Sequence, residues 1–261
     1  MIIIICLIVL LSTFIGSIIG IGGGVIIRPV LDATSFFTDP INTNTISSFC
    51  VFIGALTSII RHLIYKTKID LKVSCTLGIS AVCGGIIGNI LFTNIKAKYS
   101  SNIITIVQSI VLIILIIFSI IYILKLKGEV CFHIKNILII LLIGFFLGTL
   151  SSFLGIGGGP FNIAFLCLFF GMDLKKASVN SIIIIVFSQA SNIIQNAIKG
   201  TYNSLNVSPY LLLVLIALSI IGSLIGTKIN KKIDENKLTY INIITMFLII
   251  GINIYNILIR I

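Results

Sequence analysis

Two glycine clusters of the same sequence are the residues of this chain best suited to bind a ligand. Both read Gly-Ile-Gly-Gly-Gly, the first at residues 20–24 and the second at residues 155–159. Glycine disfavours helix, so each cluster should end one helix and leave backbone N–H groups unpaired where the next begins. Unpaired N–H groups at the positive end of a helix dipole attract anions. The clusters therefore predict an anion site, and the alternative is a pair of tight turns between packed helices.

Small polar residues begin the apolar span that follows each cluster. Asn44 and Thr45 in the first half of the chain align with Asn180 and Ser181 in the second, and further hydroxyl and amide groups follow on one helical face. Such neutral donors can coordinate an oxyanion or form hydrogen bonds between helices, and both interpretations stay open. The predicted substrate-binding residues are Gly22, Gly23, Gly24, Arg28, Asn44, Thr45, Gly157, Gly158, Gly159, Asn180, Ser181, Ser188 and Asn192.

Arg28 lies inside a predicted apolar segment. An ionisable side chain within a membrane suggests a function, so Arg28 could supply a positive charge to the anion site, or it could extend to the membrane surface. All seven carboxylates lie in or beside predicted loops, with Asp32 the deepest. Because no carboxylate falls at the centre of a span, we do not expect a carboxylate proton relay.

The composition is that of an integral membrane protein. Of 261 residues, 58% are hydrophobic and 10% are charged, with a mean hydropathy of +1.24, whereas soluble domains carry about 25% charged residues. Basic residues in short loops explain the net charge of +11, so nucleic acid is not an expected partner. The histidines and cysteines form no metal or catalytic motif. We therefore expect a multi-pass protein of a plasma (inner) membrane that is not an enzyme and binds no cofactor.

Ten apolar spans can be traced, and the two that follow the glycine clusters are unsuited to crossing a membrane. Crossing the hydrocarbon takes about 20 helical residues, but one of these spans is too short and the other contains Arg28 and Pro29. We expect each to be a half-helix that forms a hairpin with the span before it. The predicted spans are residues 2–19, 22–37, 45–60, 73–93, 103–124, 137–155, 160–171, 179–198, 209–227 and 239–259.

The two halves of the chain repeat one pattern. Besides the glycine clusters, Gly84-x-x-x-Gly88 aligns with Gly222-x-x-x-Gly226, a spacing that lets helices approach closely. We expect an all-α polytopic membrane protein of two inverted repeats, each a glycine-broken hairpin plus three transmembrane helices. The predicted repeats are residues 1–127 and 128–261.

The distribution of basic residues favours inverted halves. If each glycine hairpin returns to the side from which it entered, thirteen lysines and arginines fall on one side and five on the other, whereas a single net crossing gives nine on each. The positive-inside rule favours the uneven split, which places both termini outside. The thirteen are Arg61, Lys66, Lys68, Lys72, Lys125, Lys127, Lys135, Lys175, Lys176, Lys228, Lys231, Lys232 and Lys237, and the five are Arg28, Lys96, Lys98, Lys199 and Arg260.

The glycine clusters with Pro29 and Pro160 resemble the TauE/SafE family of sulfite exporters and related permeases. The resemblance covers nearly the whole chain, including its size and duplicated halves. It implies a secondary transporter in a lipid bilayer that exports sulfite, sulfoacetate or another sulfur-containing anion. The residues alone indicate only a small anion, bound at the helix breaks near the bilayer midplane. The alternatives are an anion channel and a non-transporting membrane assembly protein, and the oligomeric state stays open.

Overall fold

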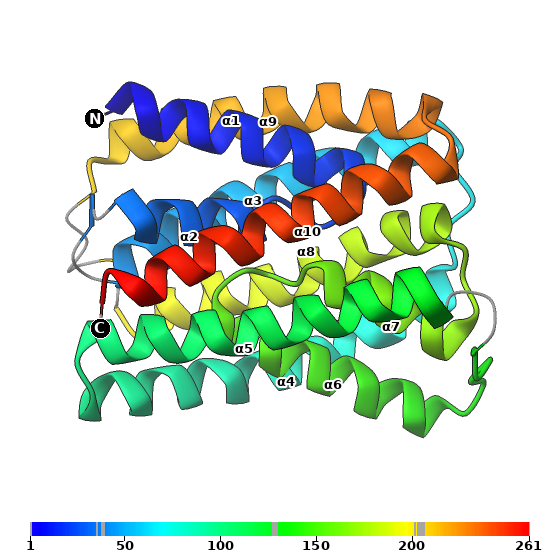
Figure 1. Ribbon diagram of the computed structural model, residues 1–261, viewed down its shortest axis with the longest axis horizontal. Helices are drawn as coiled ribbons and strands as arrows, with labels where there is room; N and C mark the ends of the chain where they lie inside the picture. The colour runs from blue at the N-terminus through cyan, green and yellow to red at the C-terminus, as the bar shows by residue number, and fades with distance from the viewer. Residues whose placement is uncertain are drawn as a thin grey trace.

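The computed structural model describes residues 2–34, 36–37, 40–126, 130–200, 202 and 207–260. Every regular element in these ranges is a helix, which confirms the predicted all-α fold (Figure 1). The predicted repeat boundary at residues 127 and 128 lies outside the described residues, as do Asp39 and Glu129. The elements are α1 (Ile2–Ile19), α2 (Gly24–Thr34), α3 (Pro40–Ile64), α4 (Leu71–Lys98), α5 (Ser101–Ile121), the π-helical η1 (Tyr122–Leu126), α6 (Ile137–Leu154), α7 (Pro160–Phe170), α8 (Leu174–Ile198), α9 (Pro209–Lys232) and α10 (Glu235–Leu258).

Within the described ranges, eight helices are long and apolar enough to cross a membrane. Apart from η1, which continues α5, the exceptions are the two helices that follow the glycine clusters. α2 and α7 have 11 residues each, and at 1.5 Å per residue this is about 16 Å, roughly half of the hydrocarbon thickness. The chain is a multi-pass integral membrane protein, and its two half-helices lie where the sequence predicts them.

Two helices begin earlier than their apolar spans indicate. α3 begins at Pro40 and α8 at Leu174, whereas the predicted spans begin at residues 45 and 179. The first turns of both helices are polar, and the Asp173 side chain caps α8 by accepting a hydrogen bond of 2.6 Å from an N–H of the first turn. Hydropathy does not detect such turns, so the polar pairs expected at the starts of these helices lie inside them.

Each glycine cluster reverses the chain. Positive φ angles occur at Gly20, Gly22 and Gly23 (88°, 75° and 74°) and at Gly157 and Gly158 (78° and 118°), which a residue with a Cβ adopts only under strain. After each break the chain returns as a half-helix. The outer ends of α1 and α2 consequently lie at the same edge of the bundle in Figure 1.

The glycine hairpin of each half packs against helices of the other half, an arrangement that we call the exchange of hairpins. α1 packs along α9 of the other half, α6 packs along α4, and α3 and α8 pack against each other. In addition α5 contacts α10, and α10 covers α2 as α5 covers α7. When each helix is replaced by its counterpart in the other half, every one of these pairings becomes another of them or stays the same. This two-fold pattern supports the internal duplication.

The repeated glycine pairs lie at these helix contacts. A Cβ on Gly88 of α4 would collide with the Thr149 carbonyl oxygen of α6, and a Cβ on Gly226 of α9 would collide with the Phe14 carbonyl oxygen of α1. Both contacts are close approaches of one helix backbone to another, at equivalent places in the two halves. The aligned G-x-x-x-G patterns are thus explained by packing.

The direction of the helices agrees with inverted halves. In Figure 1, α1 runs from the left edge towards the right and α6 runs the opposite way, and the outer ends of α1 and α10 both lie at the left. The outer surface carries many exposed leucines and isoleucines, while hydroxyl and amide side chains are buried between helices. This is the polarity expected of a protein surrounded by lipid. The inversion of the halves across a bilayer stays a prediction.

Candidate anion-binding site

The two glycine breaks meet inside the bundle. A Cβ on Gly24 would collide with the carbonyl oxygen of Ile156, so one break packs directly on the other. Ile185 of α8 borders both, because its side chain would lie 3.0 Å from a Cβ on Gly22 and 3.1 Å from one on Gly158. The two clusters, which the sequence places 135 residues apart, are therefore neighbours in the fold.

The first break is covered by its own hairpin. The N–H groups of Gly20, Ile21 and Gly22 all donate to the Gly16 carbonyl oxygen, at 2.8, 2.9 and 3.3 Å. A Cβ on Gly16 would collide with the backbone nitrogen of Gly23, so α1 lies tightly against this turn. The interpretation as a tight turn accounts for residues 20–22, while the N–H groups of Gly23 and Gly24 donate to no acceptor in the described ranges.

The second break leaves backbone donors free. Over the described ranges, the N–H groups of Gly157, Gly158 and Gly159 donate to no protein acceptor. A Cβ on Gly157 would collide with Nε2 of Gln189, and a Cβ on Gly158 would collide with Nδ2 of Asn162. Because these glycines have no side chains, two amide groups can approach the exposed backbone.

These two amides are the clearest indication of a ligand. Asn162 is fully buried, and neither its Nδ2 nor its Oδ1 has a hydrogen-bond partner within the described part of the chain. Oε1 of Gln189, a residue that is 1% exposed, also has none. Each unpaired buried polar group costs about 1–3 kcal/mol, so native proteins satisfy nearly all of them. Amide and backbone N–H donors together suit the oxygens of an anion.

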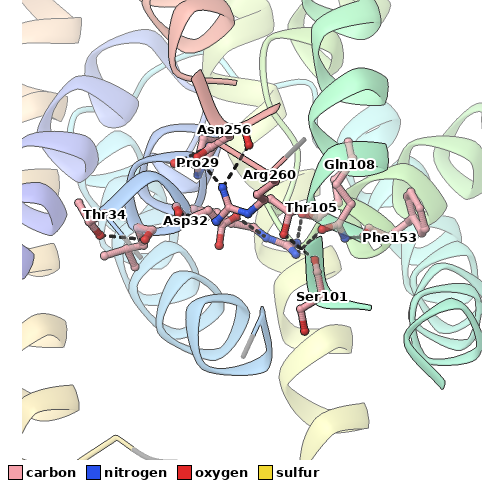
Figure 2. A network of polar contacts seen from close by, with 12 residues as sticks. Pro29, Asp32, Thr34, Ser101, Thr105, Gln108, Phe153, Asn256 and Arg260 are labelled. Atoms are coloured by element: carbon pink, nitrogen blue, oxygen red, sulfur yellow. Dashed lines mark hydrogen bonds and ion pairs between the residues drawn. The ribbon is translucent and has the colours of Figure 1, made fainter. Parts of the chain in front are cut away.

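Arg28 points into the bundle and caps the end of α6. It is 3% exposed, its Nη2 donates to Gln108 Oε1 at 2.6 Å, and its Nη1 donates to the Leu154 carbonyl oxygen. Gln108 Nε2 in turn donates to the Phe153 carbonyl oxygen at 2.6 Å (Figure 2). The guanidinium therefore lies at the negative end of the α6 dipole. The interpretation in which Arg28 extends to the membrane surface is wrong.

Asp32 is buried beside two arginines. Its Oδ2 lies 3.8 Å from Arg28 Nε, and its carbonyl oxygen accepts a hydrogen bond of 2.6 Å from Arg260 Nη2 (Figure 2). Asp32 is the deepest described carboxylate, as predicted, and it lies in the last turn of α2, close to the end of that helix at Thr34. Two guanidinium groups against one carboxylate leave this region with a net positive charge.

Arg28 and Asn44 approach the second break from the first half of the chain. A Cβ on Gly155 would collide with both Arg28 Nη1 and Asn44 Oδ1. Oδ1 of Asn44 is buried without a partner among the described residues, and so is Oγ1 of the neighbouring Thr45. The structure thus brings Arg28 and Asn44 to the break at which Asn162 and the free N–H groups lie.

Two predicted asparagines of α8 form hydrogen bonds between helices instead. Asn180 Oδ1 accepts from Ser74 Oγ at 2.6 Å. Asn192 Nδ2 donates to Ser48 Oγ at 2.9 Å, and its Oδ1 accepts from Asn89 Nδ2 at 2.9 Å. Their separation along α8 is about 18 Å at 1.5 Å per residue. The two side chains therefore do not share one site.

Two predicted serines of α8 each hold one glycine break. Ser181 Oγ donates to the Gly20 carbonyl oxygen, and Ser188 Oγ donates to the Gly157 carbonyl oxygen at 3.0 Å. These hydrogen bonds use the carbonyl side of each turn. The N–H groups on the other side of the second turn stay available.

Sequence reasoning did not include Asn162, Gln189 or Gln108 among the site residues. Asn162 is the single amide of α7 and follows the second glycine cluster by three residues. Gln108 lies in the first half of α5, next to Ser109 and before a long apolar run. A lone amide in an apolar segment was the available signal, since such groups in a membrane need partners.

Comparison with known proteins supports a transport function. Residues 5–254 match the family described as "Sulfite exporter TauE/SafE". "Probable membrane transporter protein YunE" of Bacillus subtilis is 26% identical over 266 positions, covering 92% of both chains. "Probable membrane transporter protein MJ0441" of Methanocaldococcus jannaschii is 29% identical over 238 positions, covering 85% of this chain and 84% of that protein. No solved structure matches. With its glycine-broken hairpins and eight membrane helices, the chain belongs to the TauE/SafE family of membrane transporters.

Proposed function

We propose that this chain is a secondary transporter that exports a small anion, such as sulfite or a sulfonate, and that the anion binds at the second glycine break. The observation that carries the proposal is the buried amide of Asn162, whose Nδ2 has no partner among the described residues, beside the free N–H groups of Gly157 and Gly158. An oxyanion would accept from these donors. The family description supports sulfite as the first substrate to test.

The charges around the break favour an anion over a cation. Arg28 lies against Gly155. Asp32, the only buried carboxylate of the described ranges, is paired with Arg28. A cation at the break would lie beside a guanidinium and the positive end of a helix, with no free carboxylate nearby. The free-energy cost of removing its water would therefore not be compensated. An anion would meet neutral donors and a net positive neighbourhood.

The packing supports alternating access between two inverted repeats, residues 1–127 and 128–261. Each glycine hairpin packs on helices of the other half, so a rocking of one half against the other would move both breaks together. Half-helices near the midplane are the usual place for a transported ion in inverted-repeat transporters. An anion channel would need no such movement, and this difference can be measured.

Flux into proteoliposomes tests the proposal. The wild-type protein should take up radiolabelled sulfite with saturation and counterflow, while Gly158→Val should lose at least about 90% of this flux because the side chain fills the space of the anion and resists the positive φ. Gly251→Val is the matched control, because a Cβ at Gly251 would meet nothing within 4 Å. Flux without counterflow would indicate a channel. An absence of flux for both sulfite and small sulfonates would overturn the proposal.

A further inference from the structure

Two cations share one aromatic ring at the edge of the bundle where α3 and α9 end, on the right of Figure 1. Arg61 Cζ of α3 lies 5.3 Å from the centroid of the Tyr65 ring, and Lys231 Nζ of α9 lies 4.2 Å from the same centroid. Both distances allow a cation–π attraction. We call Arg61, Tyr65, Lys231 and the neighbouring His62 the Tyr65 cluster.

Neither cation of the Tyr65 cluster has an acidic partner in the described part of the chain. Arg61 Nε is buried without a hydrogen-bond partner there, and neither Arg61 nor Lys231 forms an ion pair with a described carboxylate. The carboxylates that accept hydrogen bonds from N–H groups at helix starts of this edge are Asp70, Asp173 and Glu235. Two positive charges beside one ring repel each other, so an anion between them would lower the electrostatic energy.

His62 adds a buried nitrogen that also lacks a partner. The residue is 1% exposed, its Nδ1 lies 3.2 Å from Thr67 Oγ1, and its Nε2 has no hydrogen bond within the described ranges. One turn earlier on the two helices, Ser58 Oγ accepts a hydrogen bond of 3.0 Å from Thr227 Oγ1. Because α3 and α9 run in the same direction in Figure 1, His62 and Lys231 lie side by side one turn further along. A ligand that accepts from Nε2 would remove the cost of leaving it unpaired.

The surface beside the Tyr65 cluster is apolar. Ile60, Leu63 and Ile64 of α3 are 51%, 54% and 63% exposed, and Ile225 of α9 is 49% exposed. In a membrane protein such side chains face the hydrocarbon, and a tyrosine at the end of a membrane helix lies at the level of the headgroups. An acyl chain packed on these side chains would therefore bring its phosphate to the level of the Tyr65 ring.

We propose that the Tyr65 cluster binds the phosphate of an anionic phospholipid, which lies between Arg61 and Lys231 and accepts a further hydrogen bond from His62. A soluble phosphate or sulfite ion has the same oxyanion chemistry, and we assign the site to the lipid because its surroundings are apolar. The positive-inside rule places this edge of the bundle in the cytoplasm, where the leaflet carries anionic lipids. The proposal goes beyond the proposed transport and does not depend on it.

Lipid at the Tyr65 cluster can be measured by fluorescence. The chain contains no tryptophan, so Tyr65→Trp places a single fluorophore in the cluster and keeps an aromatic ring there. The purified protein is reconstituted into mixed vesicles of phosphatidylglycerol and phosphatidylcholine, of which one lipid at a time carries brominated chains that quench tryptophan. Tyr240→Trp, an exposed position in the second turn of α10, is the control. We expect phosphatidylglycerol to be preferred about fivefold at Tyr65→Trp and less than about twofold at Tyr240→Trp.

Two pairs of substitutions separate this site from a general attraction to the basic end. In the Tyr65→Trp protein, Arg61→Gln with Lys231→Gln should lower the preference to that of the control. Lys68→Gln with Lys237→Gln removes the same charge from exposed residues of this end and should keep at least about half of the preference. Equal losses in the two pairs would overturn the proposal. Brominated phosphatidylcholine should quench all of these proteins alike, because their folds and their contact with lipid are kept.

The source of the phosphate is decided by competition. Inorganic phosphate at millimolar concentration, compared with chloride of equal ionic strength, should leave the preference for phosphatidylglycerol unchanged. A loss of the preference with phosphate alone would assign the cluster to soluble anions and overturn the proposal, as would equal preferences at Tyr65→Trp and Tyr240→Trp. No step of the experiment measures sulfite flux, so its outcome is independent of whether the chain transports sulfite.

Discussion

At the scale of single residues, the described side chains divide into those that the protein satisfies and those that it leaves for a ligand. Asn180 is fully engaged, through hydrogen bonds with Ser74 and its own helix, whereas Asn162 has no partner among the described residues. The same residue type, equally buried, therefore has opposite energetics at the two positions. Hydrogen-bonded amides stabilise the fold, and unpaired amides destabilise it.

This contrast gives a paired prediction on two asparagines. Asn180→Ala should lower the free energy of unfolding by about 1–3 kcal/mol, because it leaves buried donors unpaired. Asn162→Ala should leave stability unchanged or raise it, yet weaken sulfite binding at least about tenfold through the loss of an amide donor. Thermal unfolding and equilibrium sulfite binding on the purified proteins measure both effects. A marked loss of stability in Asn162→Ala with unchanged affinity would show that Asn162 is structural.

A second prediction separates two roles of Arg28. Arg28→Gln should destabilise the protein by about 3 kcal/mol, because it removes one of the two guanidinium groups beside the buried Asp32 carboxylate. Adding Asp32→Asn should recover most of this stability. If Arg28 is also the counter-charge of the substrate, the double variant should still bind sulfite weakly, and Arg28→Lys should bind better than Arg28→Gln. Full recovery of affinity in the double variant would restrict Arg28 to capping α6.

At the scale of elements, hydropathy predicted which segments are helical and which are too short to cross. It could not predict that α3 and α8 begin one turn or more earlier, because polar first turns are stabilised by caps such as Asp173. It also could not tell which glycine break is open. Both clusters have the same sequence, and they differ at one equivalent pair: the Gly22 N–H donates to the Gly16 carbonyl oxygen, whereas the Gly157 N–H donates to no acceptor in the described ranges.

The exchange of hairpins predicts matched effects of equivalent glycines. Gly88→Leu and Gly226→Leu should each destabilise the protein by about 1–3 kcal/mol or more, since a Cβ at either position meets backbone of the neighbouring helix. Gly251→Leu should have almost no effect. The melting temperature in detergent measures all three. A large effect at one of the equivalent glycines alone would argue against symmetric packing of α4 on α6 and α9 on α1.

At the scale of the whole molecule, the two ends of the bundle differ in charge. The connections of α3 to α4, α7 to α8 and α9 to α10 lie at the right edge of Figure 1, while α1 begins and α10 ends at the left. Lys66 and Lys68 lie in the α3–α4 connection, and the helix turns beside the other two connections hold Lys175, Lys176, Lys231, Lys232 and Lys237, all of the predicted group of thirteen. The fold therefore separates the two groups as the charge argument requires, and the sequence could predict this because it depends only on the order of crossings.

Thiol labelling in intact cells tests this orientation. In a cysteine-free background, cysteines near Lys68 and Lys232 should be protected from an impermeant reagent, and cysteines near Lys98 and Lys199 should react. The reason is that the more basic end should face the cytoplasm. Permeabilised cells, in which all four positions should react, are the control. Equal labelling near Lys68 and Lys98 in intact cells would be incompatible with inverted halves.

The exchange of hairpins also constrains how the protein is made. α1 leaves the ribosome before its packing partner α9, which follows only after residues 20–208 have been synthesised. During that interval the face of α1 that later meets Gly222 and Gly226 has no partner from its own half. The contacts of α1 with α9 and of α5 with α10 can therefore form only after α9 and α10 have been synthesised.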